Sequence, residues 1–168
     1  MARLDISCIQ IAITLLVFTH TKSSTEASTH RNDTQDYKRC IAHERSALLA
    51  FRAGLSDTAN RLSSWEGDNC CEWKGVQCSN TTGRVVTLDL SGSSLVGRIP
   101  PQLGNLSNLR YLNLHSSSGN THSTDITWLS RLSSLEHLDM SFVNLSAITN
   151  WVSVVNKLPS LSGRVIFD

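Results

Sequence analysis

The chain has 168 residues, of which 40% are hydrophobic and 17% charged, so it is long enough for one folded domain and short for two. Its 15 basic and 14 acidic residues are spread along the chain and leave a formal charge of +1, without the basic cluster of a nucleic-acid binder. The composition excludes a collagen-like or highly charged disordered chain, and we expect no nucleic-acid partner.

The first 27 residues are predicted to be a secretory signal peptide. Arg3 precedes an apolar run from Ile6 to Phe18, which is too short to cross a bilayer and is followed by small and polar residues. An uncleaved membrane anchor is the alternative. Residues 28–39 lack apolar periodicity and are predicted to form a mobile leader, and no later segment is apolar enough to span a membrane.

Removal of the signal peptide takes away Cys8 and leaves four cysteines. An even number of cysteines in an oxidising compartment favours disulfides, and the paired spacing of a zinc site is absent from the sequence. A bond between the neighbours Cys70 and Cys71 would be strained, so Cys40 is joined to one of them and Cys78 to the other. We therefore expect two disulfides, no metal and no cofactor.

Four N-x-S/T sequons agree with secretion, because each glycan requires a solvated surface. The predicted glycosylation sites are Asn32, Asn80, Asn105 and Asn144.

Helical spacing begins at Glu44, after which Ala47, Leu48, Phe51 and Leu55 recur at intervals of three and four. This spacing predicts a short amphipathic helix, a turn-rich segment after it, and then a strand over residues 84–90. The aromatic residues expected to cover the small core of this region are Trp65 and Trp73.

From Leu88 the sequence repeats, in the segments 88–111, 112–137 and 138–163. Each segment begins with L-x-L or L-x-M, which is typical of a strand, and ends with apolar residues three apart, which is typical of a helical or 3-10 stretch. Neither part can bury its apolar side chains unless the coils stack, so we predict an α/β solenoid with a parallel sheet. The apolar residues at intervals of three are Leu103, Leu106, Leu109, Leu129, Leu132, Leu135, Val155, Leu158 and Leu161.

The segment from Leu88 to Leu106 resembles the pattern L-x-L-x-x-N-x-L-x-G-x-I-P-x-x-L-G-x-L of the plant extracellular leucine-rich repeat. Upstream, C-I-A-H-E-R-S-A-L-L-A-F-R-A-G-L and L-S-S-W…C-C-E-W-K-G-V-Q-C resemble the N-terminal cap of plant receptor-like proteins and receptor-like kinases. With L-D-M-S-F-V-N-L-S, the chain looks most like the receptor-like proteins that include the ethylene-inducing xylanase receptors.

This resemblance implies a leucine-rich repeat horseshoe with a disulfide-stapled helical cap over 40–83 and about three repeats over 84–163. It also implies the disulfides Cys40–Cys70 and Cys71–Cys78.

The sequence departs from the family pattern in two ways. Ser93, Ser117 and Val143 stand where the repeat has an asparagine, so we expect no asparagine ladder. Residues 164–168 are expected to break the repeat pattern, and we interpret the chain as the truncated beginning of a receptor ectodomain.

In a horseshoe, the residues between the inward leucines of each strand face the concave surface and are expected to be exposed to solvent. A rigid sheet with aromatic and polar side chains suits the binding of a peptide or protein, and a solvated face without a ligand is the alternative. The predicted ligand-binding residues are Asp89, Ser91, Arg110, Tyr111, Asn113, His115, Glu136, His137, Asp139 and Ser141.

No G-x-S-x-G, H-E-x-x-H, Walker or G-x-G-x-x-G motif occurs in the sequence, so we expect no enzyme. The resemblance implies a cell-surface receptor-like protein that perceives an extracellular protein or peptide in plant defence and signals through a separate receptor kinase as co-receptor. A secreted inhibitor of a pathogen wall-degrading enzyme is the second hypothesis, and a nonfunctional fragment or soluble decoy is the third. Each places the chain in the secretory pathway, outside the cell or with its repeats outside the plasma membrane.

Overall fold

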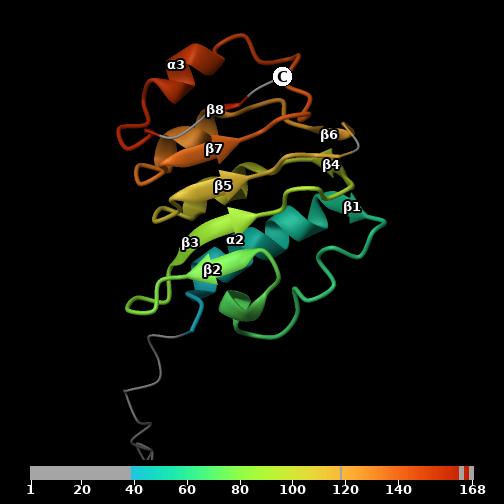
Figure 1. Ribbon diagram of the computed structural model, residues 1–168, viewed down its shortest axis with the longest axis vertical. Coiled ribbons are helices and arrows are strands. Elements are labelled where there is room, and N and C mark those ends of the chain that lie inside the picture. The colour runs from blue at the N-terminus through green and yellow to red at the C-terminus, as the bar shows by residue number, and fades with distance from the viewer. Residues whose placement is uncertain (1–38, 118, 163–164, 167–168) are drawn as a thin grey trace, which may run out of the picture. The chain divides into compact units, whose positions relative to one another are not determined.

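The computed structural model describes residues 39–117, 119–162 and 165–166 (Figure 1). The predicted signal peptide, nearly all of the predicted leader, and Asn32 lie outside the described residues. The helical elements are α2 (Ala42–Ala53), η2 (Cys70–Glu72), η3 (Pro101–Asn105), η4 (Thr127–Arg131) and α3 (Trp151–Val155), where η denotes a 3-10 turn. The strands are β1 (Leu55–Asp57), β2 (Val76–Cys78), β3 (Val85–Asp89), β4 (Leu95–Arg98), β5 (Tyr111–Asn113), β6 (Thr121–His122), β7 (His137–Asp139) and β8 (Val165–Ile166).

A five-stranded sheet carries the repeats, in the order β2-β3-β5-β7-β8. Strand β2 is antiparallel to β3, and β3, β5, β7 and β8 are parallel and lie one above another in Figure 1. Leu88, Leu112 and Leu138 are in register on these strands and are fully buried. The stacked strands and their inward leucines confirm the predicted solenoid.

A second sheet of three strands, β1-β4-β6, was not predicted from the sequence. Strand β1 pairs antiparallel with β4, and β4 pairs parallel with β6. Leu55 lies in β1 and not on the predicted face of the helix, because α2 ends at Ala53 and Gly54 caps it. The strand therefore joins the cap to the first coil by main-chain hydrogen bonds.

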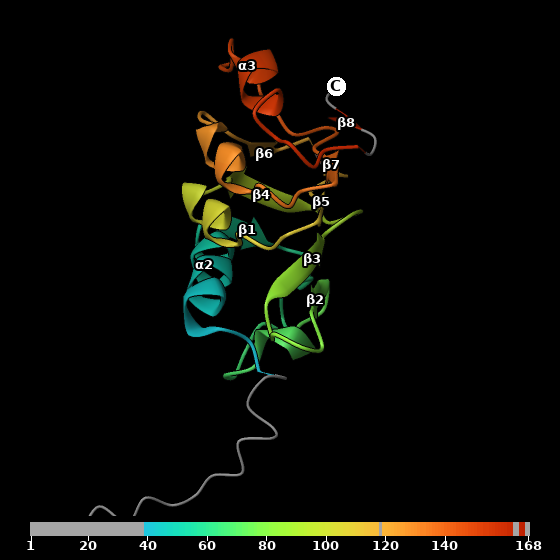
Figure 2. The same ribbon diagram turned by 90° about the vertical axis from the view of Figure 1, so that its left-hand side faces the viewer.

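The core lies between the five-stranded sheet and the helical segments α2, η3 and η4, which occupy opposite sides in Figure 2. In the first two coils, the six leucines at intervals of three are fully buried and the segments that begin them are 3-10 turns. The third coil differs, because α3 is α-helical and buries Val154, whereas the predicted Val155 is only partly buried.

Ser93 and Ser116 bridge the first two coils at the position of the family's asparagine. In the second coil the sequence pattern places Ser117 at the asparagine position, but Ser117 is exposed. The buried residue that pairs with Ser93 is Ser116, one residue earlier in the chain. The amide of Ser117 still donates to the carbonyl of Ser93 at 3.1 Å, and the Thr121 hydroxyl donates to Leu95 O at 2.7 Å. Backbone and hydroxyl hydrogen bonds thus connect the coils here.

Strand β8 lies within the segment where the sequence indicates a break in the repeat. Its residues pair with β7 in the register Leu138 with Val165 and Asp139 with Ile166. A fourth strand therefore extends the parallel sheet of the preceding coils.

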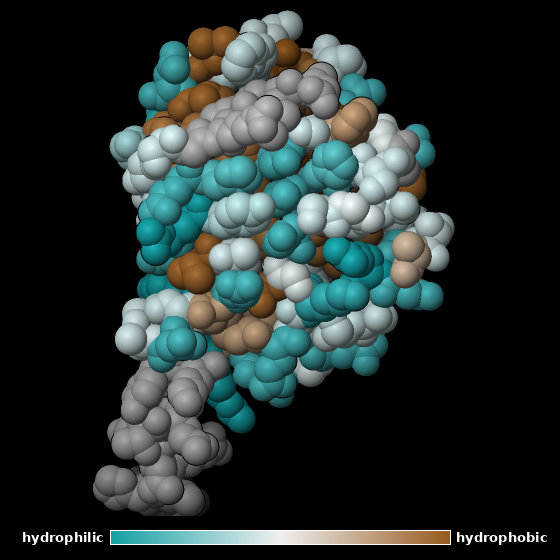
Figure 3. All heavy atoms as spheres, viewed as in Figure 1, coloured by the Kyte–Doolittle hydropathy of each residue, from teal (hydrophilic) through white to brown (hydrophobic). Residues whose placement is uncertain are grey.

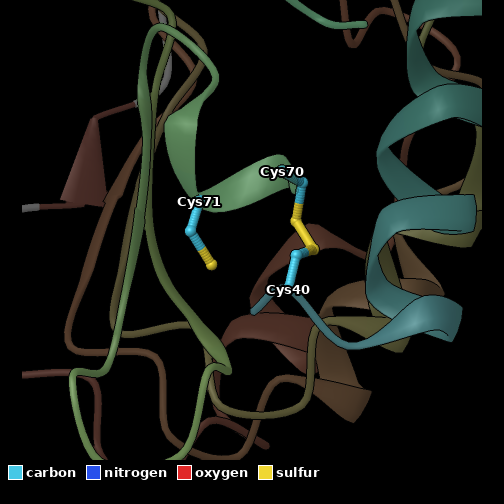
Figure 4. Close-up of side chains that lie close together, drawn as sticks. All are labelled: Cys40, Cys70 and Cys71. Atoms are coloured by element: carbon cyan, nitrogen blue, oxygen red, sulfur yellow. A yellow bond between two sulfur atoms is a disulfide. The ribbon is translucent and has the colours of Figure 1, made fainter. Parts of the chain in front are cut away.

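Two disulfides fasten the cap. Cys40 is bonded to Cys70 and Cys71 to Cys78, the pairing that the resemblance implies, with Cα atoms 5.2 and 5.4 Å apart. Figure 4 shows the Cys40–Cys70 bond and, beside it, Cys71, which is the next residue of η2 after Cys70. The Sγ atoms of these three cysteines lie within 4.8 Å of one another, but both bonds engage them, so they offer no thiolates for a metal ion.

Candidate functional site

The strands β3, β5 and β7 present two rows of outward side chains on the five-stranded sheet. Because side chains alternate along a strand, the residues on either side of the inward leucines face away from the core. One row is formed by Thr87, Tyr111 and His137, and the other by Asp89, Asn113 and Asp139. Hydrophilic residues predominate over the middle of the molecule in Figure 3. We call this surface the concave face, after the geometry expected of a horseshoe.

Tyr111 and His137 form an aromatic pair on the concave face. Their ring centroids are 4.4 Å apart and their planes differ by 5°, so the rings are stacked. Each is partly buried, and the parallel register of β5 and β7 places the two residues side by side. The sequence named both residues as site residues, but their contact depends on the register.

Arg110 and Glu136 form an ion pair at the beginning of β5 and β7. Nε and Nη2 of Arg110 lie 2.8 and 2.6 Å from Oε1 of Glu136. The side chains are 61% and 44% exposed, so solvent screens the pair and it contributes about 1 kcal/mol or less to stability. The structure thus brings together four of the predicted site residues, two charged and two aromatic.

Asp89, Asn113 and Asp139 each form the same turn at the end of a strand. The Oδ1 atom of each accepts a hydrogen bond of 2.9 or 3.0 Å from the backbone amide two residues later. This is an Asx turn, which fixes the backbone where the chain leaves the sheet. These side chains are therefore committed in part to the fold.

The predicted solvent exposure of Asn113 and Ser141 is wrong, because both are buried. Asn113 bridges its own turn and the Tyr111 hydroxyl, to which its Nδ2 donates at 3.3 Å. The Ser141 hydroxyl donates to Asp139 Oδ1 at 2.6 Å. Local hydrogen bonds turn both side chains toward the main chain and away from solvent.

His115 and Ser91, the last of the predicted residues, lie just beyond the strands and are partly buried. The His115 ring meets the ring of Phe142 edge-on, with centroids 5.4 Å apart. The backbone carbonyl of Ser91 accepts from Arg61 Nη2 at 2.9 Å. Phe142 was not predicted from the sequence as a surface residue, because a large apolar side chain in a repeat is ordinarily interpreted as core.

An apolar groove of about 700 Å³ is lined mainly by residues of the third coil. Phe142 and Trp151, two of its lining residues, are 55% and 45% exposed, and the neighbouring Val152 is 51% exposed. Figure 3 shows brown, hydrophobic side chains at this end, near α3. About half of the surface of each of these three side chains is therefore exposed to solvent.

Three of the predicted glycosylation sites, Asn80, Asn105 and Asn144, are exposed. None of them lies in the two rows of the concave face. Oδ1 of Asn105 is 3.4 Å from Arg131 Nη1, and Oδ1 of Asn144 accepts from the Ser146 amide at 3.0 Å.

Glu44 is the buried carboxylate that links the cap to the repeats. Its side chain is fully buried, its Oε2 accepts from the Val85 amide at 2.7 Å, and Arg84 Nη1 lies 3.6 Å from its Oε1. Burial is the largest influence on the carboxyl and raises its pKa, against the Val85 hydrogen bond and the Arg84 charge. The sequence placed Glu44 at the start of a helix, with no signal that it would be buried.

Two family models match the chain: a leucine-rich repeat N-terminal domain over residues 41–79 and a leucine-rich repeat over residues 84–106. The chain belongs to the leucine-rich repeat proteins. The first match coincides with the disulfide-bonded cap and the second with the first coil.

Among curated leucine-rich repeat relatives, the receptor-like protein EIX1 of Solanum lycopersicum is 31% identical over 73% of this chain. The receptor-like protein EIX2 of the same species is 37% identical over 64% of this chain. The chain spans less than a fifth of each relative, namely 18% and 12% of their lengths.

The fold is also that of solved plant receptor ectodomains. The ectodomain of the Arabidopsis receptor kinase HAESA, solved with an extended IDA peptide hormone, is 30% identical over 72% of this chain, with a TM-score of 0.56. This chain covers 20% of that structure. The ectodomain of Arabidopsis GASSHO1/SCHENGEN3, solved with CASPARIAN STRIP INTEGRITY FACTOR 2, is 29% identical over 70% of this chain and 14% of its own, with a TM-score of 0.58. Within the described residues, no helix has the length and apolar content to traverse a bilayer.

Proposed function

We propose that this leucine-rich repeat chain is the extracellular ligand-recognition module of a plant receptor-like protein, with a peptide or protein as its ligand. The observation that carries the proposal is the pair of in-register rows on the concave face, where three strands hold polar and aromatic side chains on a rigid sheet. Rigid presentation lowers the entropic cost of binding, and aromatic and charged side chains supply most of the energy at such interfaces.

The Tyr111–His137 pair is the proposed anchor of the ligand. Stacking holds each ring in place, so little side-chain freedom remains to be lost when a ligand packs against them. Asn113 Nδ2 also donates a hydrogen bond of 3.3 Å to the Tyr111 hydroxyl. Asn80, Asn105 and Asn144 lie outside these rows, so the glycans that we propose there leave the anchor open.

The proposal also includes a co-receptor and a place in the cell. The HAESA ectodomain has been solved with its peptide hormone and the co-receptor SERK1, and the receptor-like proteins EIX1 and EIX2 are relatives of this chain. We therefore propose that a separate receptor kinase joins the liganded chain at the plasma membrane in the perception of defence elicitors. The proposal assigns no catalysis, cofactor or metal to the chain.

The test uses the full chain, secreted from plant cells with an affinity tag and incubated with extracellular fluid of elicited leaves. Peptides and proteins that it retains are identified by mass spectrometry, for the unaltered chain and for Tyr111→Ala and His137→Ala. Gln102→Ala, an exposed residue of η3 away from the concave face, is the matched control.

We expect a ligand that the unaltered chain and the control retain and that both concave-face variants lose. Equal retention by all four proteins, with unchanged circular dichroism, would show that the concave face is not the binding surface.

A further inference from the structure

A polar hollow of about 390 Å³ crosses the edge of the five-stranded sheet where β3, β5 and β7 begin. Hydroxyl and amide side chains line it together with the Arg110–Glu136 ion pair. We call it the polar trough. It extends from the cap turn to the third coil, and the residues used below are Ser79, Thr82, Asn108, Arg110, Ser134 and Glu136.

The ion pair makes the polar trough electrically neutral but adds hydrogen-bonding groups to it. Both contacts from Arg110 go to Oε1 of Glu136. In the described part of the chain, neither Nη1 of Arg110 nor Oε2 of Glu136 has another hydrogen-bond partner. Nη1, which carries two N–H donors, and the acceptor Oε2 are therefore available to a ligand, and both belong to charged groups. A hydroxyl both donates and accepts, so the hydroxyls of a ligand can bond to either group.

An aromatic wall adjoins the polar trough. A second hollow of about 300 Å³ shares Arg110 and Glu136 with the trough and adds Thr87, Tyr111 and His137. The His137 ring stacks on one face of the Tyr111 ring. On the other side of Tyr111, strand β3 places the short side chain of Thr87 in register with it. The hollow therefore lies against an aromatic ring, on which the C–H face of a pyranose can pack.

We infer that the polar trough and its aromatic wall bind a neutral oligosaccharide. The hydroxyl and amide groups, the neutralised ion pair and the aromatic ring match an uncharged ligand that has many hydroxyls and an apolar C–H face on each sugar ring. The two hollows have the volumes of small-molecule sites.

A peptide fits the polar trough less well. Peptide ligands depend on apolar anchor pockets or on unpaired charges, whereas Val86 is the one aliphatic side chain that lines either hollow and the Arg110 charge is already paired. The exposed apolar side chains of the described residues near α3 belong to a different groove. The inference is thus separate from the proposed peptide ligand, although Tyr111 and His137 border both surfaces.

The experiment is isothermal titration calorimetry on the full secreted chain. The probes are cellohexaose, xylohexaose and chitohexaose, with hexagalacturonic acid as the charged counterpart. All proteins carry Asn80→Gln, so that no glycan on this sequon, next to Ser79, enters the trough. The variants are Glu136→Gln and Arg110→Gln, and Glu66→Gln, an exposed carboxylate of the cap, is the matched control.

We expect at least one neutral hexasaccharide to bind and each trough variant to weaken it about tenfold or more, because a hydrogen bond to a charged group is lost. The control should bind as the parent does. Thermal melts of all four proteins establish that they are folded.

Three results would overturn the inference: no heat with any neutral hexasaccharide, equal affinity in Glu136→Gln and Glu66→Gln, or binding of hexagalacturonic acid alone. If the trough variants instead lost a retained peptide and no oligosaccharide bound, the trough would belong to the peptide site. The proposed function would then stand and this inference would fail.

Discussion

The buried carboxylate of Glu44 accepts a hydrogen bond of 2.7 Å from the backbone amide of Val85, which joins the cap helix to the first strand of the repeats. The other oxygen of Glu44 has no hydrogen-bond partner within the described chain. Replacement by alanine would leave the Val85 amide unsatisfied in the core, so we expect Glu44→Ala to lower the free energy of unfolding by about 2–4 kcal/mol. Urea denaturation of the oxidised protein measures this loss. Glu44→Gln keeps an acceptor and should cost less.

The stability of the chain relative to Glu44→Gln should depend on pH. Because burial raises the pKa of the Glu44 carboxyl in the folded state, the folded protein holds this proton more tightly than the unfolded chain does. The stability that this proton linkage gives the folded state is fully present below the ordinary pKa of glutamate. It is lost as the pH rises through the raised pKa of Glu44 in the folded protein. The unaltered protein should therefore gain stability relative to Glu44→Gln between pH 7 and pH 4. An unchanged difference, with Glu66→Gln as the control, would contradict the raised pKa.

The two disulfides should differ in their contribution to stability. They close loops with sequence separations of 30 and 7 residues, for which the chain-entropy relation gives about 3.6 and about 2.4 kcal/mol. We expect the double variant Cys40→Ser/Cys70→Ser to lose about 1 kcal/mol more than Cys71→Ser/Cys78→Ser. Urea unfolding of each pair variant tests the order, and a greater loss from the short loop would contradict it.

Close contact between η3 and η4 predicts a large effect of Gly104→Ala. A Cβ at this position would lie 2.7 Å from the Trp128 carbonyl oxygen and 2.7 Å from Arg131 Nε, and the carbonyl belongs to the backbone of the next coil. The coils would have to separate, at a cost of about 2–3 kcal/mol. At Gly67 a Cβ meets no atom within 4 Å, so Gly67→Ala incurs only the left-handed backbone cost of about 1 kcal/mol. Comparable melting temperatures for the two variants would disprove tight packing between the coils.

Patterns of apolar residues allowed much of this fold to be predicted from the sequence. The fully buried Leu88, Leu112 and Leu138, and the leucines at intervals of three in the first two coils, lie where their spacing indicates. The β1-β4-β6 sheet was not predicted, because its strands are short and its pairing joins Leu55 to Gly97, which are distant in sequence. Spacing defines which side chains face inward but carries little information about short strands that pair across coils.

Polar side chains at the candidate site were harder to predict. The strand pattern correctly indicates that Tyr111 and His137 face outward. It also predicts an exposed side chain at Asn113, but there the side chain bonds to the nearby backbone and is buried. Glu44 illustrates the same limit, because helical spacing does not show that a backbone amide 41 residues later donates a hydrogen bond to its carboxylate. Such contacts depend on three-dimensional register, which no local pattern contains.

Two buried tryptophans, Trp65 and Trp128, differ in the hydrogen bonding of the indole N–H. The indole N–H of Trp65 donates to the Lys74 carbonyl at 3.0 Å, whereas that of Trp128 has no partner among the described residues. Both side chains are 2% exposed or less, so replacement by phenylalanine removes similar apolar area. We expect Trp65→Phe to cost about 1 kcal/mol more than Trp128→Phe, because only the first loses a hydrogen bond. The stacking of Trp65 on Trp73, with centroids 5.3 Å apart, acts in the same direction. Urea unfolding of both variants decides the matter: if Trp128→Phe were the more damaging, the Trp128 indole N–H would have to be bonded in solution.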